Sequence, residues 1–246
     1  MERFIMQDLI AWKNREDRKP LILLGARQVG KTYILKEFGQ REFEKVAYIN
    51  CDNNAMAKDL FASDYNIDRI LLTIGAITGV NIEAGKTLII MDEIQELHRG
   101  LASLKYFCEN AREYHVAVAG SLLGLSLHQG ESYPVGKVNT LEMYPMTFEE
   151  FLWARGFKQR MDLLQHGMWD VVKSLRTLYI QHLREYYLVG GMPEAVNKFI
   201  ETNDANAVRE VQEEIIRAYE KDISKREGSK NQPGMELHPF PTSQRE

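Results

Sequence analysis

Residues 20–32 read PLILLGARQVGKT, an apolar run followed by a glycine-containing loop. From Gly25 to Thr32 the loop matches the pattern G-x-x-x-x-G-K-[ST], in which glycines let the backbone turn so that successive N–H groups face a phosphate. The preceding run is apolar throughout, as expected of a strand covered on both faces. A helix over 32–38 would add its positive end at the same point. These residues predict a phosphate-binding loop.

We expect the loop and the residue after it to bind a nucleotide. This set comprises Gly25, Ala26, Arg27, Gln28, Val29, Gly30, Lys31, Thr32 and Tyr33. Lys31 would place its charge on the β- and γ-phosphates and belongs to the catalytic set, and the Thr32 hydroxyl would bind Mg²⁺. A glycine-rich turn without a ligand is the alternative, although the pattern arises by chance in only about one chain in a hundred of this length.

A second GKT triplet, Gly85-Lys86-Thr87, does not share these features. The position that should hold the first glycine is Val80, and the triplet precedes a predicted strand instead of following one. We assign it to a tight turn.

Two acidic residues follow the strand predicted over 87–91. Ligands of parallel sheets bind outside the carboxyl ends of the strands, which is where Asp92 and Glu93 would lie. Asp92 is predicted to hold Mg²⁺, mainly through water, and Glu93 to act as the general base that polarises the attacking water. Without the upstream loop, solvated carboxylates at a strand end would be the better interpretation.

A polar residue also ends the strand predicted over 116–119. Ser121 could contact the γ-phosphate or the attacking water, so it joins Lys31 and Glu93 as a catalytic candidate. A helix-capping role before Leu122 is equally open, and both roles can hold together.

Strand-like and helix-like segments alternate in the first part of the chain. We predict strands over 20–24, 46–50, 87–91, 116–119 and 138–143, and helices over 2–13, 32–38, 67–77 and 100–112. This alternation is typical of an α/β fold with a parallel sheet between helical layers. After Pro145 only helical patterns recur, over 147–155, 168–188, 193–201 and 205–224. We expect a core at 1–146, a helical lid at 147–225, and a disordered polar tail at 226–246.

The composition is that of an average globular protein. The chain has 246 residues, a net charge of −4 and 27% charged residues, so it has no global attraction to nucleic acid or to anionic membranes. It has neither a signal-peptide pattern nor a run of about 18 apolar residues, and we expect a cytoplasmic protein without a membrane segment. Cys51 and Cys108 are predicted to be free thiols. Both charge signs alternate over 205–230, which favours a solvated face, and DNA binding stays unproven.

Five segments resemble one known family. They are GARQVGKT at 25–32, IIMDEIQ at 89–95, AGSLLGL at 119–125, LEMYPMTFEEF at 141–151 and YLVGGMPEAV at 187–196. Together they are similar to the AAA-like P-loop ATPases of bacteria and archaea that usually carry a further carboxyl-terminal domain of unknown function. The resemblance covers about residues 2–225, and the chain looks like a truncated or variant member.

The resemblance implies the P-loop fold with an additional strand and a catalytic glutamate, followed by a helical or winged-helix lid. It implies ATP as nucleotide, Lys31 and Thr32 at phosphate and metal, Asp92 and Glu93 at metal and water, and Ser121 as sensor. The function to expect is Mg²⁺-dependent ATP hydrolysis that drives a conformational switch between core and lid.

Two elements of the family pattern fit less closely. Gly136-Lys137 stands where similar proteins commonly have Gly-Arg, and lysine does not replace a bidentate arginine. The run Gly190-Gly191-Met192-Pro193 looks like a lid turn over the base, but is also explained as a turn with Pro193 opening a helix.

No arginine finger can be singled out, so we expect slow basal turnover. The candidates are Arg27, Arg99, Arg112 and Arg184, and a donor on a second subunit leaves a homo-oligomer open. The aromatic cluster Tyr179, Tyr186 and Tyr187 is interpreted as helix packing, with stacking on adenine as the alternative.

Two other functions use the same loop. The chain could be an interaction module that binds ATP or ADP with little or no turnover and recruits an unknown protein partner. A P-loop kinase of a small molecule is less favoured, because the Asp92-Glu93 pair points to water as the acceptor and no acceptor pocket is recognisable.

Overall fold

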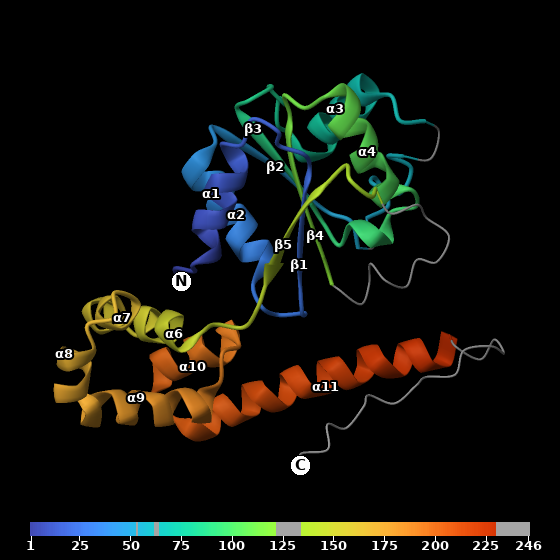
Figure 1. Ribbon diagram of the computed structural model, residues 1–246. Coiled ribbons are helices and arrows are strands. Elements are labelled where there is room, and N and C mark those ends of the chain that lie inside the picture. Colours follow the sequence, from blue (N-terminus) through green and yellow to red (C-terminus); the bar gives the residue numbers. More distant parts are fainter. Residues whose placement is uncertain (53, 62–63, 122–133, 230–246) are drawn as a thin grey trace, which may run out of the picture.

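A parallel five-stranded sheet forms the centre of the protein in a computed structural model that describes residues 1–52, 54–61, 64–121 and 134–229. The strand order is β2-β3-β4-β1-β5, and every neighbouring pair is parallel (Figure 1). The strands are β1 (Leu21–Gly25), β2 (Lys45–Asn50), β3 (Thr87–Asp92), β4 (His115–Ser121) and β5 (Asn139–Met143). All five correspond to predicted strands.

The register brings the predicted polar residues to one edge of the sheet. Gly25 at the end of β1 pairs with Ser121 at the end of β4, and Asp92 at the end of β3 pairs with Ala119. β4 therefore lies between the strand that enters the loop and the strand that ends in the acidic pair. This insertion is the additional strand that was predicted, so the fold class is confirmed.

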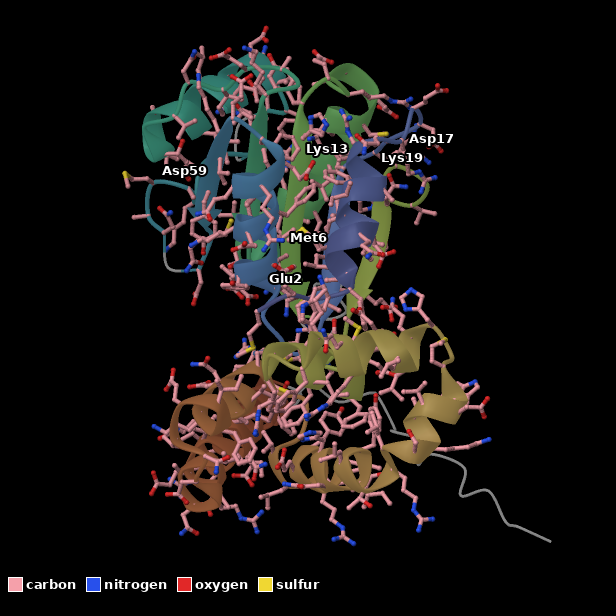
Figure 2. All side chains as sticks on the ribbon, turned by 90° about the vertical axis from the view of Figure 1, so that its left-hand side faces the viewer. Glu2, Met6, Lys13, Asp17, Lys19 and Asp59 are labelled. Atoms are coloured by element: carbon pink, nitrogen blue, oxygen red, sulfur yellow. The ribbon has the colours of Figure 1, made fainter. Side chains whose placement is uncertain are left out.

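Helices cover both faces of the sheet. One face carries α1 (Ile5–Lys13) and α2 (Lys31–Glu42), which lie side by side toward the viewer in Figure 2. The other face carries α3 (Ile67–Thr78) and α4 (Gly100–Asn110) (Figure 1). Each layer has its own buried apolar cluster, one around Leu9 and Phe38 and the other around Phe107. β3 is buried at every position because both faces of it are covered.

A group of helices follows β5 and lies below the sheet in Figures 1 and 2. They are α6 (Phe148–Ala154), α7 (Lys158–Gln165), α8 (Trp169–Ser174), α9 (Arg176–Val189), α10 (Pro193–Thr202) and α11 (Ala205–Ser229). Their side chains form two further apolar clusters, centred on Phe151 and on Leu152. Between β5 and Ser229 the described residues form helices and no strand, which agrees with the helical alternative.

Some helices differ from the prediction. The single helix expected over 168–188 is divided into α8 and α9 at Leu175, where the Ser174 hydroxyl donates to the carbonyl oxygen of Val171 at 2.7 Å. Such bonds from serine to the preceding turn bend helices. Helix α7 was not predicted, and α11 continues five residues beyond its expected end at residue 224. The rest of the predicted tail, 230–246, lies outside the described residues.

Two further expectations can be compared with the structure. Cys51 and Cys108 are both buried and free, as predicted. Within the described ranges, no helix has the length and apolar character needed to cross a membrane.

Candidate nucleotide site

The loop between β1 and α2 has the backbone conformation that its glycines permit. Gly25 has φ of +158°, and a Cβ there would lie 2.3 Å from the carbonyl oxygen of Met143, so only glycine fits. Gln28 (φ 63°) and Gly30 (φ 96°) are left-handed, and Gly30 directly precedes the first residue of α2. Alternating backbone conformations of this kind turn N–H groups toward one point, where an anion can bind.

Lys31 is the first residue of α2, directly after this loop, and its side chain is buried. Its Nζ donates to the carbonyl oxygens of Gly25 at 3.0 Å and Ala26 at 2.8 Å. Burial lowers the pKa of Lys31, and the nearby Glu93 and Asp92 carboxylates oppose that shift. The ammonium group is therefore held within the loop that would receive the phosphates, close to both acids.

Thr32 and Asp92, predicted to share a metal ion, are in direct contact. Thr32 Oγ1 donates to Asp92 Oδ2 at 2.5 Å, so a hydroxyl oxygen and a carboxylate oxygen face each other across the sheet edge. Both are hard oxygen ligands of the kind that Mg²⁺ prefers. In the part of the chain that the structure describes, no three His, Cys, Asp or Glu residues gather into a closed metal cage. This donor set fits a Mg²⁺ ion that is completed by phosphate oxygens and water.

Tyr48 is a part of this site that was not predicted. It lies on β2, beside β3, and its hydroxyl donates to the same Asp92 Oδ2 at 3.2 Å. The ammonium group of Lys36 lies 3.5 Å from the centre of its ring. Burial, together with the Asp92 charge, raises the pKa of Tyr48 to about 12, so its hydroxyl keeps its proton. Nothing in the local sequence marks Tyr48, because its role depends on β2 and β3 being neighbours.

Glu93 follows Asp92 in a left-handed conformation (φ 52°, ψ 46°) that starts a 3₁₀ turn, η1 (Ile94–Glu96). Its carboxylate accepts a hydrogen bond from the side-chain amide of Gln95. Gln95 belongs to the motif quoted at 89–95, but no role was predicted for it.

Ser121 is the last residue of β4, beside Gly25. Its side chain lies outside what the structure describes, as do residues 122–133, so both roles weighed for Ser121 stay predictions.

A cavity of about 440 Å³ adjoins the loop. Its lining residues are Met1, Arg3, Val29, Gly30, Tyr33, Met143, Met146, Pro193, Glu194 and Asn197. This volume is within the usual range of ligand pockets, and the lining combines apolar side chains with a few polar ones. Only Val29, Gly30 and Tyr33 among these residues were predicted to bind nucleotide. The others come from the segment before α1, from β5, from the segment after β5 and from α10, which meet the loop only in the folded chain.

The Gly190–Pro193 turn borders this cavity. Gly190 (φ 73°) ends α9, and Pro193 is the first residue of α10, as the simpler interpretation predicted. A Cβ on Gly191 would lie 2.3 Å from the carbonyl oxygen of Met146, so the turn packs directly on the segment after β5. Pro193 itself lines the cavity, and a position over the base stays a prediction.

The tyrosines of α9 are divided between packing and solvent. Tyr179 is buried, and Tyr186 donates its hydroxyl to the carbonyl oxygen of Met146 at 2.7 Å, which agrees with helix packing. Tyr187 is 75% exposed.

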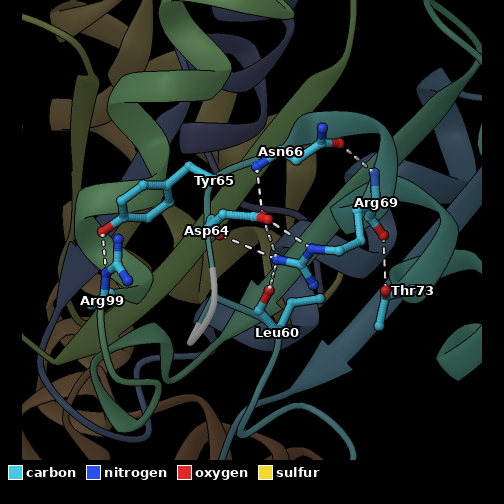
Figure 3. A network of polar contacts seen from close by, with 7 residues as sticks. All are labelled: Leu60, Asp64, Tyr65, Asn66, Arg69, Thr73 and Arg99. Carbon is cyan, nitrogen blue, oxygen red and sulfur yellow. Dashed lines mark hydrogen bonds and ion pairs between the residues drawn. The ribbon is translucent and has the colours of Figure 1, made fainter.

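Two of the arginine-finger candidates, Arg99 and Arg112, form hydrogen bonds with residues near them. Arg99 Nε donates to the Tyr65 hydroxyl at 3.0 Å, and its guanidinium carbon lies 4.3 Å from the centre of the same ring, next to the Asp64–Arg69 ion pair (Figure 3). Arg112 Nε donates to the carbonyl oxygen of Cys108 at 2.7 Å.

The other candidates lie elsewhere. Arg27 is in the loop, where its carbonyl oxygen accepts a hydrogen bond from the Tyr219 hydroxyl of α11 at 2.7 Å. Arg184 is exposed on α9. Lys137, in the Gly-Lys pair, forms an ion pair with Glu109 at 2.8 Å. The structure does not single out one of these residues as a finger.

Two family models match the chain. The family described as "AAA domain" matches residues 17–152, and a "Domain of unknown function (DUF8612)" matches residues 180–237, from α9 onward. A relative from Methanocaldococcus jannaschii, "Uncharacterized protein MJ1637", is 28% identical over 197 residues, covering 73% of this chain and 39% of the relative. The chain thus spans about two fifths of that relative's length.

Two solved structures are similar at low identity. "Structure of C. elegans PCH-2" has a TM-score of 0.43 at 12% identity, with 85% of this chain and 67% of that chain covered. The Aeropyrum pernix ORC1 protein in complex with DNA has a TM-score of 0.42 at 14% identity, with 86% and 63% covered.

The AAA domain match extends over more than half of the chain and includes the loop, the acidic pair and all five strands. It supports nucleotide binding at the loop described above. The protein belongs to the AAA-domain family of P-loop ATPases.

Proposed function

We propose that the protein binds Mg·ATP at the 25–32 loop and hydrolyses it, with the change of nucleotide shifting the core (1–146) relative to a helical lid (147–225). The contact between Thr32 and Asp92 beside the inward-held Lys31 carries this proposal, because it brings together hydroxyl, carboxylate and ammonium groups, the combination that suits a triphosphate and its metal. The AAA-domain match supports it independently.

Each residue has a defined task in this proposal. The loop amides and Lys31 bind the phosphates, and Thr32 and Asp92 would hold the Mg²⁺ ion. When bound, the ion neutralises charge that develops on the phosphate oxygens. Glu93 orients the attacking water and accepts its proton, and Ser121 contributes a polar contact to the γ-phosphate or to that water.

The adjoining cavity suits the adenine base of the nucleotide. Tyr33 offers an aromatic ring at its wall, Met143 and Met146 offer apolar surface, and Glu194 with Asn197 offers hydrogen-bonding groups. Adenine has an apolar face and a polar edge that match this division. ATP or ADP is the ligand we assign.

The helical segments touch the site at two places, which is why a switch is proposed. Pro193 of α10 lines the same cavity as Gly30 of the loop, and Tyr219 of α11 donates to the carbonyl oxygen of Arg27. A nucleotide that fills the cavity would alter the packing of Pro193, and one that reshapes the loop would alter the Tyr219–Arg27 hydrogen bond.

A comparison of the parent protein with the Glu93→Gln variant tests the proposal. Both should bind ATP with similar affinity, and only the parent should release phosphate, at a slow rate. Equal turnover of the two proteins would remove Glu93 from its role. Binding without turnover in the parent would instead favour the nucleotide-binding interaction module, and a phosphorylated metabolite among the products would favour a kinase.

A further inference from the structure

We propose that Gln95 is a positioning residue that holds the Glu93 carboxylate for proton transfer; this inference rests on the proposed hydrolysis. Gln95 is 5% exposed, although it is polar and lies beside the nucleotide site. Its Nε2 donates to Glu93 Oε2, whereas none of the described residues gives its Oε1 a hydrogen-bond partner. A buried acceptor without a partner is unfavourable, so its retention calls for an explanation.

The backbone fixes the distance between the two side chains. The left-handed Glu93 starts the η1 turn, and the amide N–H of Glu96 donates back to the carbonyl oxygen of Glu93 at 2.9 Å. A Cβ on Gly100 would lie 2.8 Å from the carbonyl oxygen of Ile94, which shows how closely α4 begins against this turn. Because packing restricts η1, the Gln95 amide has little freedom to leave Glu93.

This hydrogen bond gives the two carboxylate oxygens of Glu93 different roles. Glu93 Oε2 accepts a hydrogen bond from the Gln95 amide, which leaves Glu93 Oε1 to accept the proton of the attacking water. An amide is a neutral donor that does not give up its proton to the base, so it orients Glu93 without neutralising it. The reversed amide would set its carbonyl oxygen against a carboxylate oxygen, so the present orientation is the favourable one.

Kinetics of Gln95→Leu test the proposal in the presence of nucleotide. This variant removes both the donor and the unpartnered acceptor at similar volume. Turnover should fall at least about tenfold, while the dissociation constant for ATP should stay within about twofold. The reason is that Gln95 contacts Glu93, the general base, and not the phosphate-binding loop. In the Glu93→Gln background, where turnover is already lost, Gln95→Leu should leave the dissociation constant for ATP within about twofold as well.

A charge exchange tests the same contact without nucleotide. Gln95→Glu sets two carboxylates against each other and should lower the Tm by roughly 5 °C. The double variant Glu93→Gln/Gln95→Glu restores an amide–carboxylate pair, so its Tm should return toward that of the parent, yet its turnover should stay absent because the carboxylate is misplaced.

The outcomes separate this inference from the proposed function. No hydrolysis by the parent protein would refute the proposed function and, with it, a catalytic role for Gln95. Hydrolysis by the parent with unchanged turnover in Gln95→Leu would overturn the inference alone. Equal loss of ATP affinity and turnover, or no recovery of Tm in the double variant, would show that Gln95 has only a structural role.

Discussion

Arg3 and Glu150 form a buried ion pair that joins the segment before α1 to the first helix after the sheet. Arg3 Nε lies 3.0 Å from Glu150 Oε1, and the two side chains are 6% and 5% exposed. Arg3 also donates to the carbonyl oxygens of Val29 at 3.1 Å and Tyr144 at 2.6 Å. A single guanidinium group therefore contacts the nucleotide loop, the segment after β5 and α6.

Removing one partner of this pair should destabilise the protein strongly. Arg3→Met leaves the Glu150 carboxylate buried without its counter-charge, and we expect a loss of about 3 to 5 kcal/mol in the free energy of unfolding. Urea denaturation of the parent and the variant measures this loss in the free energy of unfolding. Adding Glu150→Gln to Arg3→Met should recover part of the loss, because the buried charge is gone; a double variant less stable than Arg3→Met would contradict this explanation.

The two GKT triplets provide a matched pair of lysines for nucleotide binding. Lys31→Ala should abolish ATP binding, measured by calorimetry with Mg²⁺, because it removes the buried ammonium group inside the loop. Lys86→Ala is the control, since Lys86 is in a surface ion pair with Glu44 at 3.4 Å, away from the loop. We expect that control to bind ATP like the parent, and equal losses in both variants would count against the assigned site.

Tyr48→Phe should weaken the metal site more than the nucleotide site. The variant removes the hydroxyl that donates to Asp92 and so loosens the carboxylate that faces Thr32. We expect the Mg²⁺ concentration for half-maximal ATP binding to rise about tenfold, as for other residues that support metal ligands. ATP affinity measured in EDTA should hardly change. Tyr114→Phe, on the opposite layer, serves as control, and an equal change with and without Mg²⁺ would refute the role of Tyr48.

Two glycines with positive φ should respond differently to alanine. In Gly25→Ala the new Cβ meets the backbone oxygen of Met143 at 2.3 Å, so the loop must move, and we expect loss of ATP binding together with about 2 to 3 kcal/mol of stability. At Gly136 (φ +73°) no atom of the described residues lies within 4 Å of an added Cβ, so alanine should cost only about 1 kcal/mol and leave binding intact. Unfolding curves and nucleotide titrations of both variants distinguish these effects.

His115 should make stability depend on pH. Burial, with smaller contributions from Arg18 and Lys13, lowers the pKa of His115 to about 4 from its ordinary 6.5. The unfolded chain therefore binds the proton first as pH falls, so the stabilisation is complete above pH 6.5 and is lost progressively down to pH 4. The difference amounts to about 3 kcal/mol.

His115→Phe separates this contribution from that of the carboxylates. His115 packs against the rings of Trp12 and Phe43, so phenylalanine can occupy the same position. Urea unfolding at several values between pH 4 and pH 7 should give a flatter profile for the variant than for the parent. Parallel profiles would show that His115 binds a proton as readily in the folded protein as in the unfolded chain.

The sequence predicted those parts of the site that lie within one continuous segment. The 25–32 loop and the Asp92-Glu93 pair could be predicted because glycine spacing, strand burial and charge are local properties. Tyr48 could not, since its contact with Asp92 depends on which strands are neighbours. The cavity wall at Met143 and Asn197 likewise forms only when β5 and α10 meet the loop.

The same reasoning explains which elements of the fold were predicted. Four strands were found because each contains a short run of apolar and β-branched residues between turns, and β5 was found because its polar and apolar residues alternate. The break at Leu175 was missed because no glycine or proline marks it, and the bend follows from the Ser174 hydroxyl and from packing. The end of α11 was placed too early, because Lys225, Arg226 and Glu227 are polar and yet good helix formers.

The attachment of α11 to the nucleotide loop has a mechanical consequence. This helix has 25 residues, which corresponds to about 37 Å at 1.5 Å per residue. Tyr219, its point of contact with Arg27, lies a little beyond the middle. If the proposed switch moves the loop and the helix pivots near Ala205, a displacement of about 1 Å at Tyr219 would become about 1.7 Å at the tip, so α11 would act as a lever arm. Motion of a single loop carbonyl would in this way be amplified at a point remote from the phosphate-binding loop.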